Sequence, residues 1–170
     1  MKTTKKGFTL IELIVVIAII GVLAAILVPS MLGYVKKSKI QSANSTASSV
    51  YKALNSALTE LDEQDADFPT DGKHEIDSTG FSAFDASSFY SSVKNYFGDV
   101  TKIKDGNCVV RLTEGMCDAV AVKSGKYYGT YPGIYTSSNY GEKKTYNPKS
   151  IDDAYGHATA EADKGSTKNT

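Results

Sequence analysis

The chain has 170 residues, with 19 Lys and Arg against 19 Asp and Glu, and so has a formal net charge of zero at pH 7. This balance, with Arg111 as the single arginine, argues against the basic face of a nucleic-acid-binding protein. Two cysteines are too few for a disulfide scaffold or for a zinc site of four thiolates.

The first predicted element is an apolar helix near the N-terminus. From Leu13 to Val28 the chain has no charged or strongly polar side chain, and starting at Phe8 brings the stretch to about 20 residues, enough to cross a bilayer. Lysines precede this stretch, so that end is expected in the cytoplasm and the rest of the chain is expected to be exported. The one charged residue inside the stretch is Glu12.

Glu12 separates three interpretations of this segment. A secretory signal peptide, with a weak cleavage site at Val22-Leu23-Ala24, and a permanent single-span anchor both leave an acid in hydrocarbon unexplained. In the third, a peptidase cuts between Gly7 and Phe8, which places a new positive amine one helical turn from Glu12. That amine, or the amine of a neighbouring subunit, pairs with the carboxylate and favours one axial offset between packed subunits.

The stretch Lys5-Lys6-Gly7-Phe8-Thr9-Leu10-Ile11-Glu12 resembles the prepilin motif of type IV pilins. That motif has a basic leader ending in Gly, an N-terminal Phe and a Glu as the fifth mature residue. The detailed resemblance covers about the first third of the chain. It implies that a prepilin peptidase removes the leader and N-methylates Phe8. It also implies that Glu12 assists docking on a neighbour, and that the N-terminal helices build a helical filament.

The helix is predicted to continue as an amphipathic segment and to end near Leu61, before Asp62-Glu63-Gln64-Asp65. Gly21 and Pro29 weaken it, and we expect a kink there. The segment from Gly21 to Gly33 is expected to lose helicity when a subunit enters a filament. The apolar stripe of the second half consists of Ala43, Ala47, Val50, Tyr51, Leu54, Leu58 and Leu61.

An irregular acidic region is predicted next, followed by one short helix. The spacing of its aspartates does not match an EF-hand, so a solvated loop is expected. Asp85 is the expected cap of the short helix, which ends at Phe97 and turns Phe89, Val93 and Tyr96 inward.

The period of the pattern then changes to two, which predicts strands at Asn107–Thr113 and Met116–Lys123 joined by a tight turn. A third strand is expected at Lys126–Thr136, at an edge or broken by Pro132. This turn pairs Thr113 with Met116. The same register places Arg111 opposite Asp118, Cys117 opposite Leu112 and Cys108 opposite Ala121.

Cys108 and Cys117 are then about 13 Å apart along the strands, which favours unbonded thiols, although a wider loop would allow a bridge. Many pilins have a disulfide near the C-terminus, and this chain lacks that pair. Its last segment must therefore be held by packing and hydrogen bonds. That segment is predicted to be a polar loop and a frayed tail, in which Ser150-Ile151-Asp152-Asp153 can cap a short helix.

No catalytic or cofactor-binding pattern is visible, so the chain is not expected to be an enzyme. His74 and His157 stand alone, as surface histidines rather than metal ligands. The tyrosines of the last third are predicted to pack in the sheet rather than to stack on nucleobases.

The predicted fold is α+β, with a long N-terminal helix packed on a small antiparallel β-sheet head. The predicted divisions are a leader (1–7), an apolar transmembrane and filament-core helix (8–33), its amphipathic continuation (34–61), a loop region with a short helix (62–106), the β-sheet (107–136) and the polar C-terminal loop and tail (137–170).

The resemblance implies a major pilin that lies in the cytoplasmic membrane, N-terminus inward, before it assembles into an extracellular pilus for adhesion, aggregation or twitching motility. The implied partners are other copies of the chain, a prepilin peptidase and N-methyltransferase, and an assembly platform in the membrane. No specific nucleic acid and no cofactor is expected. A type II secretion pseudopilin and a competence pilin share the motif. A secreted soluble domain differs from all of these, because it would start after Ala24 rather than at Phe8.

Overall fold

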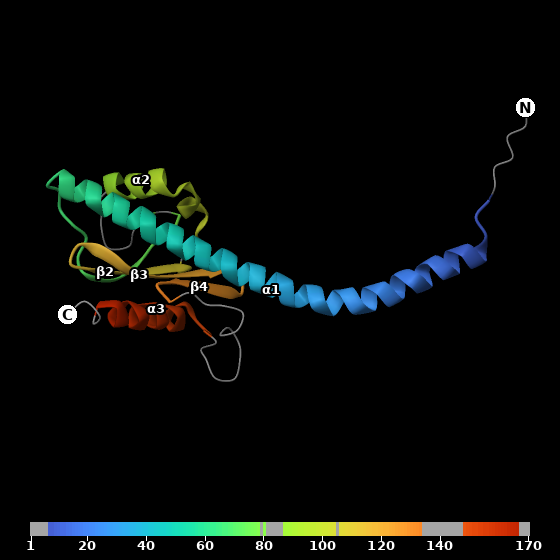
Figure 1. Ribbon diagram of the computed structural model, residues 1–170. Helices are drawn as coiled ribbons and strands as arrows, with labels where there is room; N and C mark the ends of the chain where they lie inside the picture. The colour runs from blue at the N-terminus through green and yellow to red at the C-terminus, as the bar shows by residue number, and fades with distance from the viewer. Residues whose placement is uncertain (1–6, 79, 81–86, 105, 134–147, 167–170) are drawn as a thin grey trace, which may run out of the picture. The chain divides into compact units, whose positions relative to one another are not determined.

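The computed structural model describes residues 7–78, 80, 87–104, 106–133 and 148–166. It divides the chain into two compact units, Met1–Lys36 and Lys37–Thr170. The second unit, here called the head, contains the sheet (Figure 1).

Helix α1 runs from Leu10 to Glu63, within two residues of the prediction at each end. Its most apolar 18-residue window has a mean hydropathy of 3.2, so it is long and apolar enough to cross a membrane. In the head the predicted stripe is confirmed. Tyr51 is half-buried, and the other six members of the stripe are buried.

The sheet has four antiparallel strands in the order β1-β2-β3-β4, which are Gly72–Glu75, Cys108–Thr113, Met116–Ser124 and Tyr127–Tyr131. Strand β1 lies in the region that was predicted to be irregular. The prediction missed this strand because Gly-Lys-His-Glu has no alternating apolar pattern. Strand β4 forms an edge and ends before Pro132, as that proline predicts. The rest of the expected third strand, from 134 to 136, lies outside the described residues.

The β2–β3 turn at Glu114-Gly115 is confirmed, with Thr113 opposite Met116. Both turn residues have positive φ, 52° and 75°, as a type I′ turn requires. The register shifts between Arg111 and Leu112 because Asp118 is an additional residue in β3, which makes a β-bulge. Arg111 therefore lies opposite Ala119 and Cys108 opposite Val122, so both predicted pairs were wrong by one residue, while Leu112 opposite Cys117 is confirmed.

Helix α2 spans Ser87–Tyr96, and the short 3-10 helix η1 follows at Gly98–Lys102. Phe89 and Val93 are buried as predicted, but Tyr96 is 51% exposed, so its inward orientation was wrong. The Tyr96 hydroxyl instead donates a hydrogen bond of 2.6 Å to Glu60 at the outer surface of α1. The predicted cap, Asp85, lies outside the described residues.

Helix α3 spans Ile151–Ser166 and replaces much of the predicted polar tail. Its apolar face is built from small side chains, Ala154 and Ala158, so its sequence reads as polar although the helix packs on β3 and β4. The predicted start is confirmed: the Ser150 hydroxyl oxygen accepts the N–H of Asp153 at 3.1 Å.

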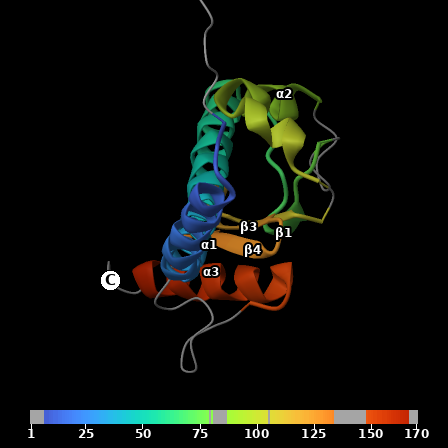
Figure 2. The ribbon, with the colours of Figure 1, turned by 90° about the vertical axis from the view of Figure 1, so that its right-hand side faces the viewer.

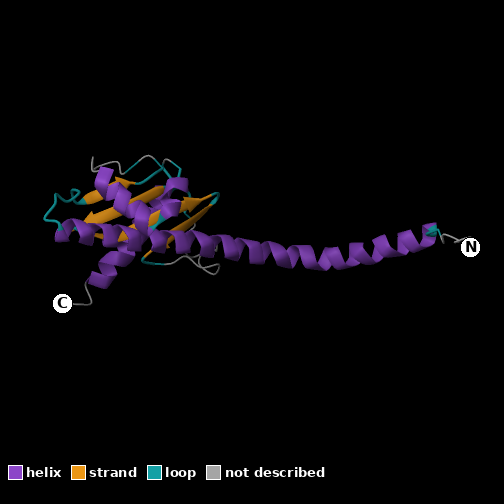
Figure 3. Cartoon of the chain, turned by 90° about the horizontal axis from the view of Figure 1, so that it is seen from above, coloured by secondary structure: helices purple, strands orange, loops and turns teal. Residues whose placement is uncertain are grey.

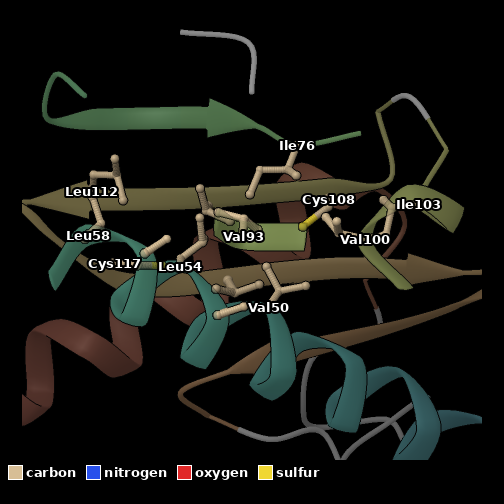
Figure 4. Close-up of a cluster of buried hydrophobic side chains, with 14 of the residues drawn as sticks. Val50, Leu54, Leu58, Ile76, Val93, Val100, Ile103, Cys108, Leu112 and Cys117 are labelled. Atoms are coloured by element: carbon tan, nitrogen blue, oxygen red, sulfur yellow. The ribbon is translucent and has the colours of Figure 1, made fainter. Parts of the chain in front are cut away.

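The head therefore has three layers, seen edge-on in Figure 2, with α1 and α2 on one face of the sheet and α3 on the other. Figure 3 shows α1 crossing above the strands of the sheet. The main core fills the space between α1, α2 and the sheet, and Figure 4 shows part of it. A smaller cluster, which includes Ala121, Tyr128 and Ala154, joins the sheet to α3.

Candidate functional site

The N-terminal unit presents a continuous apolar surface. Within this unit the large apolar side chains are exposed all around the helix, from Phe8 at 79% to Val16 at 45%. A soluble monomer rarely exposes apolar patches of more than a few hundred Å². This surface therefore needs a partner, which is lipid, protein, or each in turn.

Glu12 lies at the start of that surface, where it closes the first turn of α1. The N–H of Thr9 donates to Glu12 Oε2 at 2.9 Å, and the Thr9 hydroxyl donates to the same oxygen at 2.7 Å. In return, the N–H of Glu12 donates to Thr9 Oγ1 at 3.4 Å. This reciprocal arrangement is a capping box, in which Thr9 is the N-cap and Glu12 is three residues further on.

Sequence reasoning missed this role, although Thr9-Leu10-Ile11-Glu12 has the Thr-x-x-Glu pattern that signals it. Glu12 therefore has two candidate tasks, capping its own helix and pairing with an amine. Both hydrogen bonds to Thr9 fall on Oε2. Within the described residues no hydrogen bond reaches Oε1, so a positive partner can approach that oxygen.

The predicted cleavage site precedes the helix. Gly7 and Phe8 are exposed and lie outside any helix or strand, and the lysines before them are outside the described residues. Phe8 lines a shallow apolar hollow at the helix surface together with Glu12 and Val15. The first residue of the expected mature chain and the carboxylate thus border the same hollow.

Gly21 and Pro29, the predicted weak points, both lie inside a continuous helix. Pro29 has no N–H, so the carbonyl of Ala25 lacks its usual helical donor. The Ser30 hydroxyl donates to the carbonyl of Leu27 at 2.8 Å, within the same turn. The kink at these two positions stays a prediction.

The two cysteines lie in the core of the head and are free thiols (Figure 4). Burial raises the pKa of Cys108 to about 12 and also raises the pKa of Cys117. Such thiols remain protonated at neutral pH and are poor nucleophiles. They belong to the packing of the head.

Among the described residues, no group of three or more His, Cys, Asp or Glu side chains is arranged to hold a metal ion. His74 was expected at the surface, and this was wrong, because it is only 5% exposed. Its Nε2 lies 2.6 Å from the carbonyl oxygen of Thr70, which ties the loop before β1 to that strand.

Comparison with known proteins agrees with these features. The family described as "Prokaryotic N-terminal methylation motif" matches residues 2–28. A "Fimbrial protein" of Pseudomonas aeruginosa is 36% identical over 120 residues, which are 70% of this chain and 74% of that protein.

Two other relatives match over shorter stretches. The "Type IV major fimbrial protein FimA" of Dichelobacter nodosus is 43% identical over 67 residues, 39% of this chain and 41% of that protein. The "Type IV major pilin protein PilA" of Myxococcus xanthus is 44% identical over 57 residues, 34% of this chain and 26% of that protein. No solved structure is a significant match.

Proposed function

The chain belongs to the type IV pilin family, and from that premise we propose that it is the major structural subunit of a type IV pilus. The filament would serve adhesion, aggregation or twitching motility. The observation that carries the proposal is the exposed apolar helix with one carboxylate, Glu12, at its start. The names of the relatives favour a pilus over a pseudopilus or a DNA-capturing filament.

Processing comes first in the proposed sequence of events. The subunit lies in the cytoplasmic membrane with its lysine-rich leader inside, following the positive-inside rule. A prepilin peptidase cuts between Gly7 and Phe8 and N-methylates Phe8. Cleavage removes three lysines and creates a positive amine at the start of α1. That amine is the partner that an acid in hydrocarbon requires.

Assembly then transfers the helix from lipid to protein. The capping box holds Glu12 on the first turn through Oε2, which leaves Oε1 for a partner. We expect the Phe8 amine of a neighbouring subunit to pair with Glu12, because each charge alone is costly in an apolar medium. The pairing fixes the axial offset between subunits, and an assembly platform in the membrane supplies them one at a time. Such an open, head-to-tail arrangement extends into a filament.

A pair of substitutions at Glu12 separates its two tasks. Glu12→Gln keeps the capping box, because Gln fills that position as well as Glu does, but it removes the charge. Glu12→Ala removes both. We expect both variants to be cut at Gly7 and to yield at least tenfold fewer filaments than the wild type, as counted by electron microscopy of sheared material.

N-terminal sequencing and intact mass provide the control on processing, with mature chains that begin at methylated Phe8. Gly7→Leu should instead retain the leader and yield no filaments. Normal assembly of Glu12→Gln would show that Glu12 only caps its helix, and the charge-pairing proposal would be wrong. A functional wild-type chain that keeps residues 1–7 would overturn the proposed function.

A further inference from the structure

The head has an open groove of about 750 Å³ between α1, η1 and the end of β3. One wall consists of hydroxyl-bearing residues of α1, such as Ser45, and the apolar lining includes Phe97. Three exposed lysines also line the groove: Lys102, Lys104 and Lys123. Asp99 is the one described carboxylate in the lining, and its ion pair with Lys102, at 2.7 Å, is largely exposed. We call this feature the lysine groove.

The opposite charge gathers at the end of α1. Residues 53–72 include six Asp or Glu and no Lys or Arg. Asp62, Asp67 and Asp71 are exposed there. Glu114 of the β2–β3 turn lines one hollow of the surface together with Asp62 and Asp71. We call this surface, residues 62–71 with Glu114 and Met116, the acidic tip.

The acidic tip also carries exposed apolar side chains. Phe68 is 37% exposed and Met116 is 59% exposed, and both line the same hollow as Asp62 and Asp71. The acidic tip thus has apolar side chains among carboxylates. The lysine groove has the corresponding arrangement with the opposite charge, an apolar lining within a basic rim. The two surfaces are opposite in charge, and each combines its charges with apolar side chains.

The two surfaces cannot meet within one molecule. Ser45 in the groove wall and Asp62 in the tip are 17 residues apart on the same helix. At 1.5 Å per residue they are separated by about 26 Å along α1. The same order holds along β3, where Met116 belongs to the tip and Ser124 to the groove. A tip that fills the groove must therefore come from a second copy of the chain.

We propose that the lysine groove of one pilin receives the acidic tip of another, so that heads in the filament join end to end. This rests on the proposed filament function. The contact uses different surfaces on its two sides, as an open assembly requires. Copies in contact are offset by about 26 Å along α1. Attraction between exposed charges weakens with salt, since the screening length is about 8 Å at physiological ionic strength.

Charge reversal tests the contact directly. In cells, the groove variant Lys102→Glu/Lys104→Glu/Lys123→Glu places acid against acid, and the tip variant Asp62→Lys/Asp67→Lys/Asp71→Lys places base against base. We expect each triple variant to lower the yield of sheared filaments at least tenfold. The chain that carries both triple variants should recover at least half of the wild-type yield, because the pairing is restored with its signs exchanged.

A matched control reverses three exposed lysines outside the groove, Lys52→Glu/Lys94→Glu/Lys149→Glu, which has the same change in net charge. Its yield should stay within twofold of the wild type. Immunoblots of mature subunit in the membrane show whether the variants fold and are processed. Low subunit levels in the combined variant would show that the reversals damage the head itself. Exchanging the signs would then not restore the contact, and this outcome would count against the proposal.

Cross-linking adds a readout of geometry. Ser45→Cys with Asp67→Cys should give a ladder of disulfide-linked subunits when filaments are oxidised, whereas either substitution alone should give none. The native cysteines do not interfere, because both are buried. Normal filament yield in the groove variant, or no ladder from the paired cysteines, overturns the inference and leaves the pilus assignment intact. Failure of the unmodified chain to form filaments overturns both.

Discussion

At position 129 the backbone of α1 approaches strand β4 so closely that only glycine fits. A Cβ on Gly129 would lie 2.1 Å from the carbonyl carbon of Ala43 and 2.4 Å from the N of Asn44. The approach also lets the side-chain oxygen of Asn44 accept the N–H of Thr130 at 3.1 Å. Helix α1 thereby contributes a polar partner to the edge strand of the sheet.

Gly129→Ala should therefore destabilise the head strongly. The methyl group meets backbone, which cannot swing aside as a flexible side chain can, so we expect a loss of about 3 kcal/mol or more in the free energy of unfolding. Urea unfolding of the full chain in detergent, followed by circular dichroism, measures it. The matched control is Gly156→Ala in α3, where an added Cβ has no atom of the described part of the chain within 4 Å. It should stabilise the protein by up to about 1 kcal/mol. Equal effects of the two substitutions would contradict the close approach.

The buried thiols give a pH dependence. A group whose pKa is higher in the folded state stabilises the protein below its unfolded pKa, and this contribution is lost as pH rises. For Cys108, with a folded pKa of about 12, the loss begins near pH 8.5, the ordinary value for cysteine. Stability should fall by about 2 kcal/mol for each thiol between pH 8.5 and 10.

Chemical unfolding at several pH values checks this, with Cys108→Ala/Cys117→Ala as the control that should show a much flatter profile in this range. The folded protein should also resist alkylation by iodoacetamide at pH 8 and become reactive only in urea. Rapid labelling of the folded chain would show that the thiols are accessible.

Sequence reasoning worked at the residue scale where a requirement is local. The position of Glu12 after Gly7 and Phe8 pointed to the prepilin motif. The capping pattern Thr9-Leu10-Ile11-Glu12 is equally local, although it was missed. The requirement for glycine at 129 was not legible. It arises from contact between β4 and a helix that is far away in the chain, and no local pattern encodes that contact.

At the scale of elements, the bulge in β3 explains why the predicted register failed for half of its pairs while the predicted ion pair still formed. Asp118 has no direct partner in β2, yet its carboxylate accepts two hydrogen bonds from Arg111 Nε, at 2.8 and 3.0 Å, and one from Nη2 at 2.8 Å. Hydrogen bonding to Asp118 raises the pKa of Arg111 further above its ordinary value. Arg111 Nη2 also donates to Asp163 of α3 at 2.7 Å.

The start of helix α3 was predicted, but its full length was not, because its packing face is made of alanines rather than large apolar residues. Its contacts fulfil the expectation that the C-terminal segment is held by packing and hydrogen bonds. Besides Arg111, Lys73 of β1 pairs with Asp152 at 2.5 Å. Helix α1 has its own polar link to the sheet: the Asn55 side chain donates to the carbonyl of Cys117 and accepts its N–H, at 3.0 and 2.9 Å.

Double-mutant cycles should rank these ion pairs by burial. Arg111 and Asp118 have side chains 21% and 30% exposed, so Ala substitutions at both should give a coupling energy of roughly 2 kcal/mol. Asp163 is 66% exposed, and its coupling to Arg111 should stay below about 1 kcal/mol. The exposed pair Lys102 and Asp99 is the control and should give a similarly small value. Equal couplings for all three pairs would contradict this ranking.

At the scale of the whole molecule, the separation of an apolar helical segment from a head was predictable, because it follows from the hydropathy and the period of the sequence. A helix that is apolar all round must be buried in something larger, and the stripe that follows it packs on one head. The order and pairing of the strands were only partly predictable. A four-residue strand and a one-residue bulge leave no periodic signal, although both position charges that hold the layers of the head together.

The weak segment of α1 gives a prediction for the proposed filament. Pro29 leaves one carbonyl without its helical donor, and Gly21 and Gly33 lower the helix propensity on either side. When neighbouring helices replace lipid, strain between packed subunits should be absorbed here, so helicity should be lost between 21 and 33. Hydrogen–deuterium exchange of that segment should be at least tenfold faster in filaments than in micelles, while residues 43–61 stay protected in both. Gly21→Ala/Gly33→Ala, whose added Cβ atoms have no neighbour within 4 Å among the described residues, should slow the exchange. Uniform protection along α1 in wild-type filaments would show that the helix remains intact.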